Sequence, residues 1–469
     1  MDRLFVWTVV AVCGGAAAAG SPNVLFIAVD DLRPELGCYG ATQVLSPHID
    51  AFAETATVFE RGYCNIPVCG ASRASLMTGI LPTADRFKTF YARADEDVPG
   101  AVTLPQRFKE AGYRTVSVGK ILHVPRDTEE VSWSEPAWRP KGRSWQRWFD
   151  PTGPFSRGPE PKKKPKHGPV AGSADVDDSE TQDGMIADKA IAELQTAAAG
   201  DAPFFLACGF FKPHMPFYAP KRYWDLYERD AIELADNRFR PRNAPDGLHS
   251  GSKEYRSYIL GDYKDDSDRF HRMMRHGYFA CVSFIDAQIG RVLDELDRLG
   301  LAEDTVVVLW GDHGWHLGEH EFWGKHNTLH NALRVPFVVR MPGGDAGRST
   351  ALVETIDLFP TLCELAGLST PASVQGRSFA GLLDGRETTH RDHIYSRFVR
   401  ADAVVTERFA YSEYRNPKTA DVTGRMLYDH ASDPDENVNV VDEPAYEAEV
   451  ARLAALVAER MREADAASW

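Results

Sequence analysis

The run Asn23-Val24-Leu25-Phe26-Ile27-Ala28-Val29 leads directly into the pair Asp30-Asp31. A continuous apolar run of this length predicts a buried strand. The two adjacent carboxylates that follow it repel each other unless a cation lies between them. Ligands of open α/β sheets bind beyond the carboxyl ends of the strands. This stretch therefore predicts a buried strand of such a sheet, with a cation-binding pair of aspartates at its end.

Segments further along the chain alternate between strand-like and helix-like patterns. Helical spacing of apolar residues is clearest over residues 279–299, where Gly300 ends the helix. Shorter helices are predicted at 49–55 and 72–78, and further buried strands at 115–118, 204–209, 305–310 and 336–340. Helices that alternate with continuous apolar strands indicate a mostly parallel sheet that helices cover on both faces. The predicted fold class is therefore α/β.

Two of these strands also lead into polar residues. Asp312-His313 follows the strand predicted at 305–310, and Lys212-Pro213-His214 follows the strand predicted at 204–209. Since ligands of such a sheet lie beyond the carboxyl ends of its strands, these groups are expected near Asp30-Asp31. Three unconnected segments thus predict one active site at that edge.

Composition divides the chain into three parts. Residues 1–20 have a charged start, a short apolar core and small residues at the end, which is typical of a secretory signal peptide. Residues 21–370 hold the alternating segments and are predicted to form the catalytic domain. Residues 371–469 are more polar and predict a small α+β subdomain, in which a terminal helix at 446–464 follows short strands at 392–397, 403–406, 409–415 and 426–429.

An insertion at residues 130–178 interrupts the alternating pattern of the catalytic domain. It contains Trp133, Trp138, Trp145 and Trp148, and then the basic run Lys162-Lys163-Lys164. Long insertions in compact domains are usually functional or disordered. We expect the tryptophan-rich half to face the substrate, because aromatic rings stack on sugar rings, and the lysine-rich half to be solvated.

Charge and cysteine content limit the location and partners of the protein. The net charge of −15 argues against a nucleic-acid partner, and an anion-binding pocket would have to be locally basic. The N-terminal apolar run is short for a membrane span, so we expect export without stable membrane insertion, with a lipoprotein anchor on Cys13 as the alternative. The seven cysteines form no paired framework and no zinc pattern. A Cys38–Cys64 disulfide remains open beside free buried thiols.

One cysteine stands in a distinctive motif, Cys69-Gly70-Ala71-Ser72-Arg73, which continues to Thr78-Gly79. An isolated cysteine is most often a small buried hydrophobe, and a thiolate nucleophile would need a basic partner that this motif lacks. The motif resembles the C-x-(P/A)-x-R signature of the type I sulfatases. Phrases at residues 30–40, 211–217, 278–283 and 312–320 are most similar to the iduronate 2-sulfatases. The resemblance extends over residues 22–365 and short phrases near the C-terminus.

This resemblance implies an alkaline phosphatase-like sandwich and the hydrolysis of sulfate esters. It implies that a formylglycine-generating enzyme oxidises Cys69 to formylglycine, whose hydrate attacks sulfur with one hydroxyl. The other hydroxyl would lose its proton and expel sulfate, which regenerates the aldehyde. The implied substrate is a sulfated polysaccharide or glycosaminoglycan oligosaccharide, with a 2-O-sulfated uronic acid as a candidate.

The resemblance also assigns roles to individual residues. One divalent cation would be bound by Asp30, Asp31, Asp312, His313 and the modified Cys69, and Ca²⁺ is expected because it prefers oxygen ligands. The catalytic residues would be Cys69, Arg73, Lys120, His123, His214 and Lys325. Arg73 would orient the diol, His123 would take its proton, and His214 would protonate the leaving oxygen together with Lys325. The substrate-binding residues would be Lys120, His214, Trp315 and Lys325.

Two other functions are compatible with parts of this pattern. A phosphatase or phosphonate hydrolase of the alkaline phosphatase-like superfamily shares the Asp and His framework, but often uses a Thr or Ser nucleophile with two zinc ions. A carbohydrate-binding protein could keep the fold without activity. Cys69 together with Arg73 favours sulfate over phosphate, and the complete set of catalytic positions favours an enzyme.

Overall fold

The computed structural model describes residues 20–141, 168–248 and 254–469. Its main element is a seven-stranded sheet with the order β11-β2-β10-β7-β1-β5-β3. The strands are β1 (Asn23–Val29), β2 (Thr57–Tyr63), β3 (Arg114–Gly119), β5 (Phe204–Phe210), β7 (Thr305–Gly311), β10 (Phe337–Arg340) and β11 (Gly347–Glu354). All neighbouring pairs are parallel except those of β10, which is antiparallel to both β7 and β2. The predicted mostly parallel sheet is confirmed.

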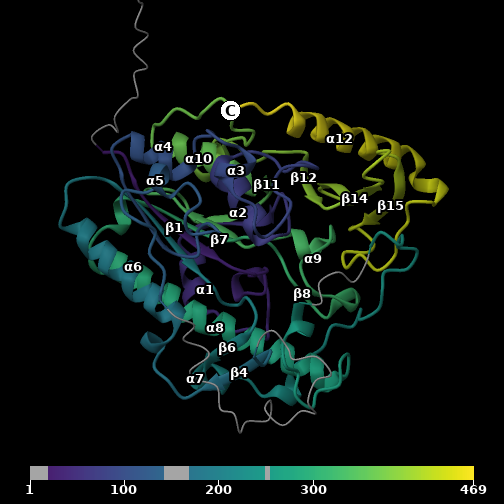
Figure 1. Cartoon of the computed structure of the whole chain (residues 1–469), viewed down its shortest axis with the longest axis horizontal. Coiled ribbons are helices and arrows are strands. Elements are labelled where there is room, and N and C mark those ends of the chain that lie inside the picture. The colour runs from purple at the N-terminus through teal and green to yellow at the C-terminus, as the bar shows by residue number, and fades with distance from the viewer. Residues whose placement is uncertain (1–19, 142–167, 249–253) are drawn as a thin grey trace, which may run out of the picture.

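Helices cover both faces of this sheet (Figure 1). One face carries α1 (Pro47–Ala53), α6 (Gln182–Ala198) and α8 (Asp268–Arg298), and the other carries α2 (Cys69–Thr78), α4 (Leu104–Glu110) and α10 (Leu358–Leu365). Side chains alternate along a strand. The odd-numbered residues of β1 from Leu25 to Val29 therefore join the first core, and the even-numbered residues from Val24 to Ala28 join the second. This double burial explains why the sequence of β1 is continuously apolar.

A smaller antiparallel sheet forms the C-terminal part. Its strands are β12 (His393–Phe398), β13 (Ala401–Thr406), β14 (Phe409–Arg415) and β15 (Val422–Asp429), in that order, and α12 (Glu447–Asp465) packs on it. Leu453 and Val457 of α12 share a buried cluster with Tyr395 and Tyr411 of the sheet. The strands and the helix lie within a few residues of their predicted positions. The same cluster includes Ile356, which ties this part to the main sheet.

Short elements complete the described chain. They are α3 (Ala94–Asp97), α5 (Glu129–Ser132), β4 (Ala171–Ala174), β6 (Phe217–Pro220), α7 (Lys221–Trp224), β8 (His316–Leu317), β9 (Trp323–Gly324), α9 (His330–Leu333) and α11 (Ala380–Leu383). None of the described helices is both long and apolar enough to cross a membrane.

Several elements were not predicted from the sequence. β2 contains the half-buried pair Glu60-Arg61, which breaks its apolar run. β11 is one of the two edge strands of this sheet, and its first residues are largely exposed. These positions tolerate charge because they are not covered on both faces. The helix predicted at 72–78 begins earlier, at Cys69.

Trp133 and Trp138 attach the start of the insertion to the main domain, and the burial of Trp133 is contrary to the expectation that the tryptophan-rich half faces a substrate. Trp133 is 3% exposed and belongs to the core beside β1. The Trp138 amide donates to the carbonyl of Ser117, and Trp138 thereby extends the edge of β3. Both residues therefore fasten the start of the insertion to the sheet. Trp145, Trp148 and the run Lys162-Lys163-Lys164 lie outside the described residues, as do Cys13 and residues 1–19.

The cysteines of the described chain are all free, so Cys38 and Cys64 form no disulfide. Cys64 is buried and Cys38 is partly exposed. The sequence left open whether Cys38 and Cys64 form a disulfide or are free thiols, and in the structure they are free thiols.

Candidate active site

The site forms where three parallel strands end. Val29 lies opposite Phe210 of β5 and Gly311 of β7. The Asp30 amide donates to the Phe210 carbonyl at 3.2 Å, and the Asp312 amide donates to the Val29 carbonyl at 3.2 Å. These bonds extend the ladders by one residue. They bring Asp30-Asp31 and Asp312-His313 together at the edge of the sheet where the sequence placed them.

A left-handed residue brings the two neighbouring aspartates into one site. In a regular strand, Asp30 and Asp31 would point to opposite faces. Asp31 instead has φ 61°, a conformation that aspartate adopts more readily than most residues but that still costs about 1–3 kcal/mol. The Tyr278 hydroxyl donates to the Asp31 carbonyl at 2.9 Å and the Asp31 amide donates to Asp312 Oδ1 at 3.1 Å. The turn is thus held by its surroundings.

The acidic and imidazole groups at this edge are arranged as metal ligands. Ligand atoms of Asp30, Asp31, Asp312 and His313 lie within 4.8 Å of one another, and so do those of Asp30, Cys69 and His313. Asp30 Oδ1, Asp31 Oδ2 and His313 Nε2 are buried and have no hydrogen-bond partner among the described residues. His313 Nδ1 contacts the Gly314 carbonyl at 3.0 Å, which directs Nε2 toward the carboxylates. Buried polar atoms are rarely left without partners, so this donor set fits a divalent cation.

Three buried cations balance the three carboxylates. Arg73 Nε donates to Asp312 Oδ2 at 2.8 Å, Lys325 Nζ donates to Asp31 Oδ1 at 2.6 Å, and Lys120 Nζ pairs with Asp30. Burial alone would raise the pKa of Asp30, but Lys120, His214 and Arg73 hold that pKa well below its usual range. Burial alone would lower the pKa of Lys325, but Asp31 raises it well above its usual range. The Asp30 carboxylate and the Lys325 ammonium are therefore charged at neutral pH.

Cys69 is the first residue of α2 and lies beside His123. Cys69 Sγ is 3.4 Å from His123 Nδ1. Burial, followed by the positive charge of Lys120, lowers the pKa of His123 to about 3, so that its imidazole is neutral at neutral pH. The structure thus supplies the basic partner that the cysteine motif itself lacks. Arg73, which was predicted to orient the group at position 69 and to offset local charge, contacts the carboxylates of Asp312 and Asp30.

Two glycines let Lys120 approach the site. Gly119 of β3 pairs with Gly209 of β5, and the Lys120 amide donates to the Gly209 carbonyl at 2.7 Å. A Cβ atom on Gly119 would lie 2.1 Å from that carbonyl oxygen, and Gly119 has φ 79°. A side chain there would separate the ends of the two strands. The close approach of the two strand ends therefore fixes the backbone position from which the Lys120 side chain extends.

His214 lies on the loop after β5, at the mouth of the site. Its Nε2 is 3.9 Å from Asp31 Oδ2 and 3.8 Å from Glu254 Oε1, and its side chain is 23% exposed. It is more accessible than Lys120, Arg73 and Lys325, which are nearly fully buried. Glu254 was not predicted, because a lone acidic residue outside any motif does not indicate a function. Only the structure shows that it lies beside His214.

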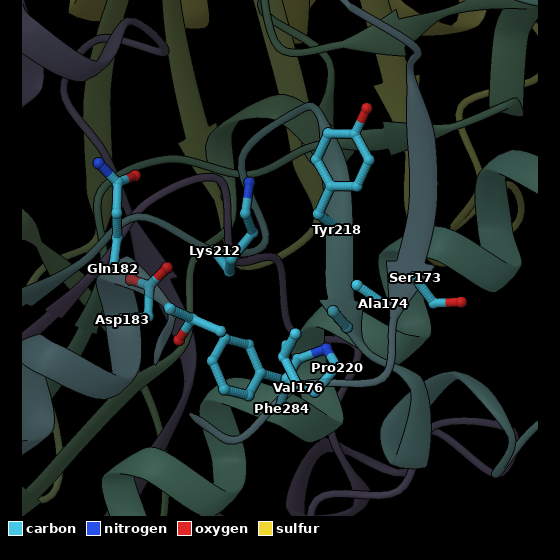
Figure 2. Close-up of a pocket in the computed structure, with 11 residues that line it drawn as sticks. Ser173, Ala174, Val176, Gln182, Asp183, Lys212, Tyr218, Pro220 and Phe284 are labelled. Atoms are coloured by element: carbon cyan, nitrogen blue, oxygen red, sulfur yellow. The ribbon is translucent and has the colours of Figure 1, made fainter. Parts of the chain in front are cut away.

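Lys212 holds the loop that carries His214. Its buried ammonium donates to the His214 carbonyl at 2.8 Å and to the Pro216 carbonyl at 2.6 Å. At the start of the loop, Asp183 Oδ1 accepts from the Phe211 amide at 2.6 Å. Figure 2 shows Lys212 and Asp183 on the wall of a pocket behind this loop. Lys212 stands in the motif Lys212-Pro213-His214, but the motif alone does not show that its side chain folds back onto its own loop.

Trp315 requires a correction, because it was predicted to bind substrate. Its side chain is 0% exposed, whereas His214 keeps accessible surface at the mouth of the site. Lys325 Nζ lies 5.1 Å from the centroid of the Trp315 ring. A cation is attracted to the face of an aromatic ring. The Trp315 ring therefore packs against the Lys325 ammonium and has no exposed surface that a sugar could contact.

Comparison with known proteins agrees with this geometry. Residues 22–368 match the sulfatase family model, and residues 318–463 match the model described as N-sulphoglucosamine sulphohydrolase, C-terminal. The chain is 33% identical to iduronate 2-sulfatase from Mus musculus over 445 residues, which cover 86% of this chain and 80% of that protein. The chain belongs to the sulfatase family. This sulfatase is therefore a hydrolase of sulfuric esters.

Solved structures with the same fold include proteins that differ from one another in substrate. A phosphonate monoester hydrolase from Silicibacter pomeroyi superimposes on this sulfatase with a TM-score of 0.76 at 25% identity, covering 94% of this chain and 96% of that one. A structure in complex with its substrate D-glucosamine-2-N,6-O-disulfate has a TM-score of 0.72 at 20% identity, covering 95% and 98%. The alkaline phosphatase-like fold predicted from the sequence is thereby confirmed.

Proposed function

We propose that this sulfatase removes a sulfate ester from a sulfated polysaccharide or glycosaminoglycan oligosaccharide, with a 2-O-sulfated uronic acid as the sugar. The reaction would use formylglycine made from Cys69 and one divalent cation, which we take to be Ca²⁺. One observation carries the proposal. The buried atoms Asp30 Oδ1, Asp31 Oδ2 and His313 Nε2, which have no hydrogen-bond partner among the described residues, surround one point beside Cys69.

The charge balance supports a cation and an anionic substrate. Asp30, Asp31, Asp312 and His313 would hold the cation, with the modified residue 69 as a further ligand. When bound, the cation offsets negative charge that develops on the ester. Because three fixed cations already balance the three carboxylates, a divalent ion would leave the site positive within a protein of net charge −15. A locally positive pocket favours sulfate binding.

Each remaining residue can be given a role from its position. His123 Nδ1 is 3.4 Å from the Cys69 sulfur, where it can take a proton from a hydroxyl at residue 69. Lys120 is paired with Asp30 and Lys325 is paired with Asp31. Each ammonium can bind sulfate oxygens from its own side of the site. His214 Nε2 faces the site from its exposed mouth, where the sugar would leave, and can donate a proton to the departing oxygen.

The substrate class rests on the relatives and on the chemistry of the site. Iduronate 2-sulfatases from Mus musculus and Homo sapiens are each 33% identical to this chain over most of its length. We further propose that a formylglycine-generating enzyme matures Cys69, and that residues 1–20 direct export to the periplasm or the cell exterior. A lipoprotein anchor on Cys13 is the alternative outcome of that signal.

A phosphonate or phosphate ester is the second candidate substrate. The likeness to the phosphonate monoester hydrolase at a TM-score of 0.76 favours it. Against it stands the cluster of carboxylates beside Cys69, the one candidate metal site among the described residues, which differs from the two-zinc framework with a Thr or Ser nucleophile.

Two measurements test the proposal. Tryptic cleavage releases the peptide of residues 62–73, and its mass should be lower than unmodified cysteine predicts. Cys38→Ala serves as a matched control, because it removes another thiol and leaves that mass change in place. The purified protein should then release sulfate from 4-nitrophenyl sulfate much faster than it cleaves the phosphate and phenylphosphonate analogues. Faster phosphonate cleavage, or an unmodified Cys69 in fully active protein, would contradict the proposal.

A further inference from the structure

A second hollow lies next to the active site. Its volume is about 400 Å³, and its lining includes Asp246, Leu248, His326, Phe398, Arg400 and Tyr414. His326 directly follows Lys325, whose ammonium contacts Asp31 in the site. The hollow therefore begins one residue away from a group that we expect to contact sulfate.

The opposite wall of the hollow, formed by Phe398, also packs close to the active site. The rings of His326 and Phe398 are stacked, with centroids 5.4 Å apart and planes inclined by 11°. Phe398 also packs against a buried cluster that contains Val68 and Ala71, on either side of Cys69 in the sequence. The hollow thus lies between the loop that carries Lys325 and a hairpin that rests on the segment of the nucleophile.

The tip of that hairpin has a strained conformation. Val399 and Arg400 form a two-residue turn between β12 and β13, in which Phe398 pairs with Ala401. Val399 has φ 52°, which is rare for a β-branched residue, and tight hairpins of this kind favour Gly or Asn at such positions. Both turn residues are exposed. Strain held at the rim of a hollow beside an active site points to a function.

The charges at the rim suit a polar, anionic ligand. Arg400 is exposed and forms no ion pair with any residue that the structure describes. A guanidinium binds a carboxylate or a sulfate through paired hydrogen bonds. Asp246, across the same hollow, can accept from sugar hydroxyl groups, and the Phe398 and Tyr414 rings supply apolar surface for a sugar face.

We propose that this hollow, the hairpin subsite, binds the sugar next to the one that loses sulfate. Arg400 pairs with an anionic group of that neighbouring sugar. The hairpin subsite consists of Asp246, His326, Phe398, Arg400 and Tyr414. The inference rests on the proposed function, because it assumes a carbohydrate with at least two units as the substrate.

Kinetics with two esters test the subsite. One probe is 4-nitrophenyl sulfate, which has no second sugar, and the other is a disaccharide of a 2-O-sulfated uronic acid and N-sulfoglucosamine. Arg400→Ala should lower kcat/KM about tenfold for the disaccharide and leave turnover of 4-nitrophenyl sulfate unchanged. Arg386→Ala, which removes another exposed arginine, should change neither rate. Equal losses with both esters, or no loss with either, would overturn the subsite.

A binding measurement separates failure of the subsite from failure of the proposed function. The disaccharide is titrated calorimetrically into Cys69→Ala protein, with and without Arg400→Ala, so that no turnover is needed. We expect Arg400→Ala to raise Kd about tenfold. If the native protein cleaves neither ester but Arg400→Ala still weakens binding, the proposed function is wrong and the subsite stands. If both esters are cleaved and Kd is unchanged, the subsite is wrong and the proposed function stands.

Discussion

Two buried clusters of charged residues hold this protein together in different ways. The active-site cluster contains Asp30, Asp31 and Asp312, with Arg73, Lys120 and Lys325 as their cations. The C-terminal cluster contains Glu354 and Asp357, with Arg391 and Arg460 as their main cations, and joins the end of β11 to β12 and α12. Both clusters are excluded from solvent. They differ in how their carboxylate oxygens are satisfied.

Every carboxylate oxygen of the C-terminal cluster has a partner within the protein. Arg460 donates to both oxygens of Glu354 at 2.8 Å. Asp357 accepts from Arg391 Nε at 2.8 Å and from the Arg377 and Glu354 amides at 2.7 and 3.0 Å. In the active-site cluster, one oxygen of Asp30 and one of Asp31 have no hydrogen-bond partner in the described part of the chain. A closed cluster serves the fold, whereas an open cluster is arranged for a ligand.

The strongest test of this contrast pairs one variant from each cluster. Cys69→Ala should lower sulfate release by at least about a thousandfold and change the free energy of unfolding by about 1 kcal/mol or less, because it removes the nucleophile and one buried sulfur. Glu354→Gln should instead lose about 3–5 kcal/mol of stability, because it removes the buried carboxylate that pairs with Arg460 and leaves only the partly exposed Glu463 as a charge partner.

Both variants are measured by sulfate release per folded molecule and by denaturant unfolding. Turnover that persists in Cys69→Ala would refute the assignment of the nucleophile. A Glu354→Gln protein with normal stability would show that the closed cluster is not structural.

Removal of divalent cations should affect one cluster alone. Chelation should lower sulfate release by about a hundredfold and stability by about 3 kcal/mol, the effect of a ligand present at roughly one hundred times its Kd. Ca²⁺ and Mg²⁺ are then added back separately, and the recovered rate identifies the preferred ion. The loss of stability on chelation should be the same in Glu354→Gln as in the native protein, since the two clusters share no ion-paired residue and their effects should add. A chelator-resistant enzyme would contradict the proposed cation site.

Lys212 is a third kind of buried charge, because its partners are neutral carbonyls. Lys212→Met should lower kcat/KM for 4-nitrophenyl sulfate about tenfold to a hundredfold, since a small displacement of His214 misaligns it. Lys189→Met on α6, which removes a half-exposed lysine paired with Glu193, serves as the control. The pH profile of kcat is recorded for both variants. If Lys212→Met loses stability but keeps the native kcat/KM, Lys212 does not position His214.

Acid should weaken the closed cluster in a defined pH range. Burial alone would raise the pKa of Asp357, but Arg391 and His390 hold it well below its usual value of 3.8. A lowered pKa stabilises the fold above the usual value, and this stabilisation is lost as the pH falls below about 4. The stability difference between native protein and Asp357→Asn should therefore be constant above about pH 5 and shrink by about 2 kcal/mol toward pH 2. A difference independent of pH would exclude this role.

The smallest expected effect concerns the hairpin tip. Val399→Gly should raise the free energy of unfolding by about 1 kcal/mol, because glycine adopts a positive φ without strain. The exposed Val131→Gly change, in a four-residue helix, should lower it by a similar amount. Thermal unfolding of both variants gives the sign. A Val399→Gly protein less stable than the native one would show that the turn is not strained.

The sequence predicted those parts of the molecule in which local pattern and tertiary environment agree. β1 and β7 are buried on both faces, so their apolar runs identified them, and the polar residues after each strand located the site. β2 and β11 lie toward one side of the sheet, where a charged pair and exposed residues conceal the strand pattern.

The errors concern side chains whose surroundings come from distant residues. Trp133 and Trp315 could each have stacked on a sugar, but the first is buried in the core and the second lies against the Lys325 ammonium. Glu254 reaches His214 from 40 positions away, a distance that no local pattern encodes. Long-range packing, rather than residue type, decides such roles.

The catalytic centre forms only when β1 pairs with its neighbours in the correct register. Side chains alternate along a strand, so a shift of β1 by one position against β5 and β7 would exchange its two apolar faces, and both are apolar enough to tolerate it. Such a misaligned chain could remain compact, yet its aspartates would no longer meet Asp312 and His313. Specific activity per milligram should consequently detect misfolded protein that spectroscopic measures of helix and strand content overlook.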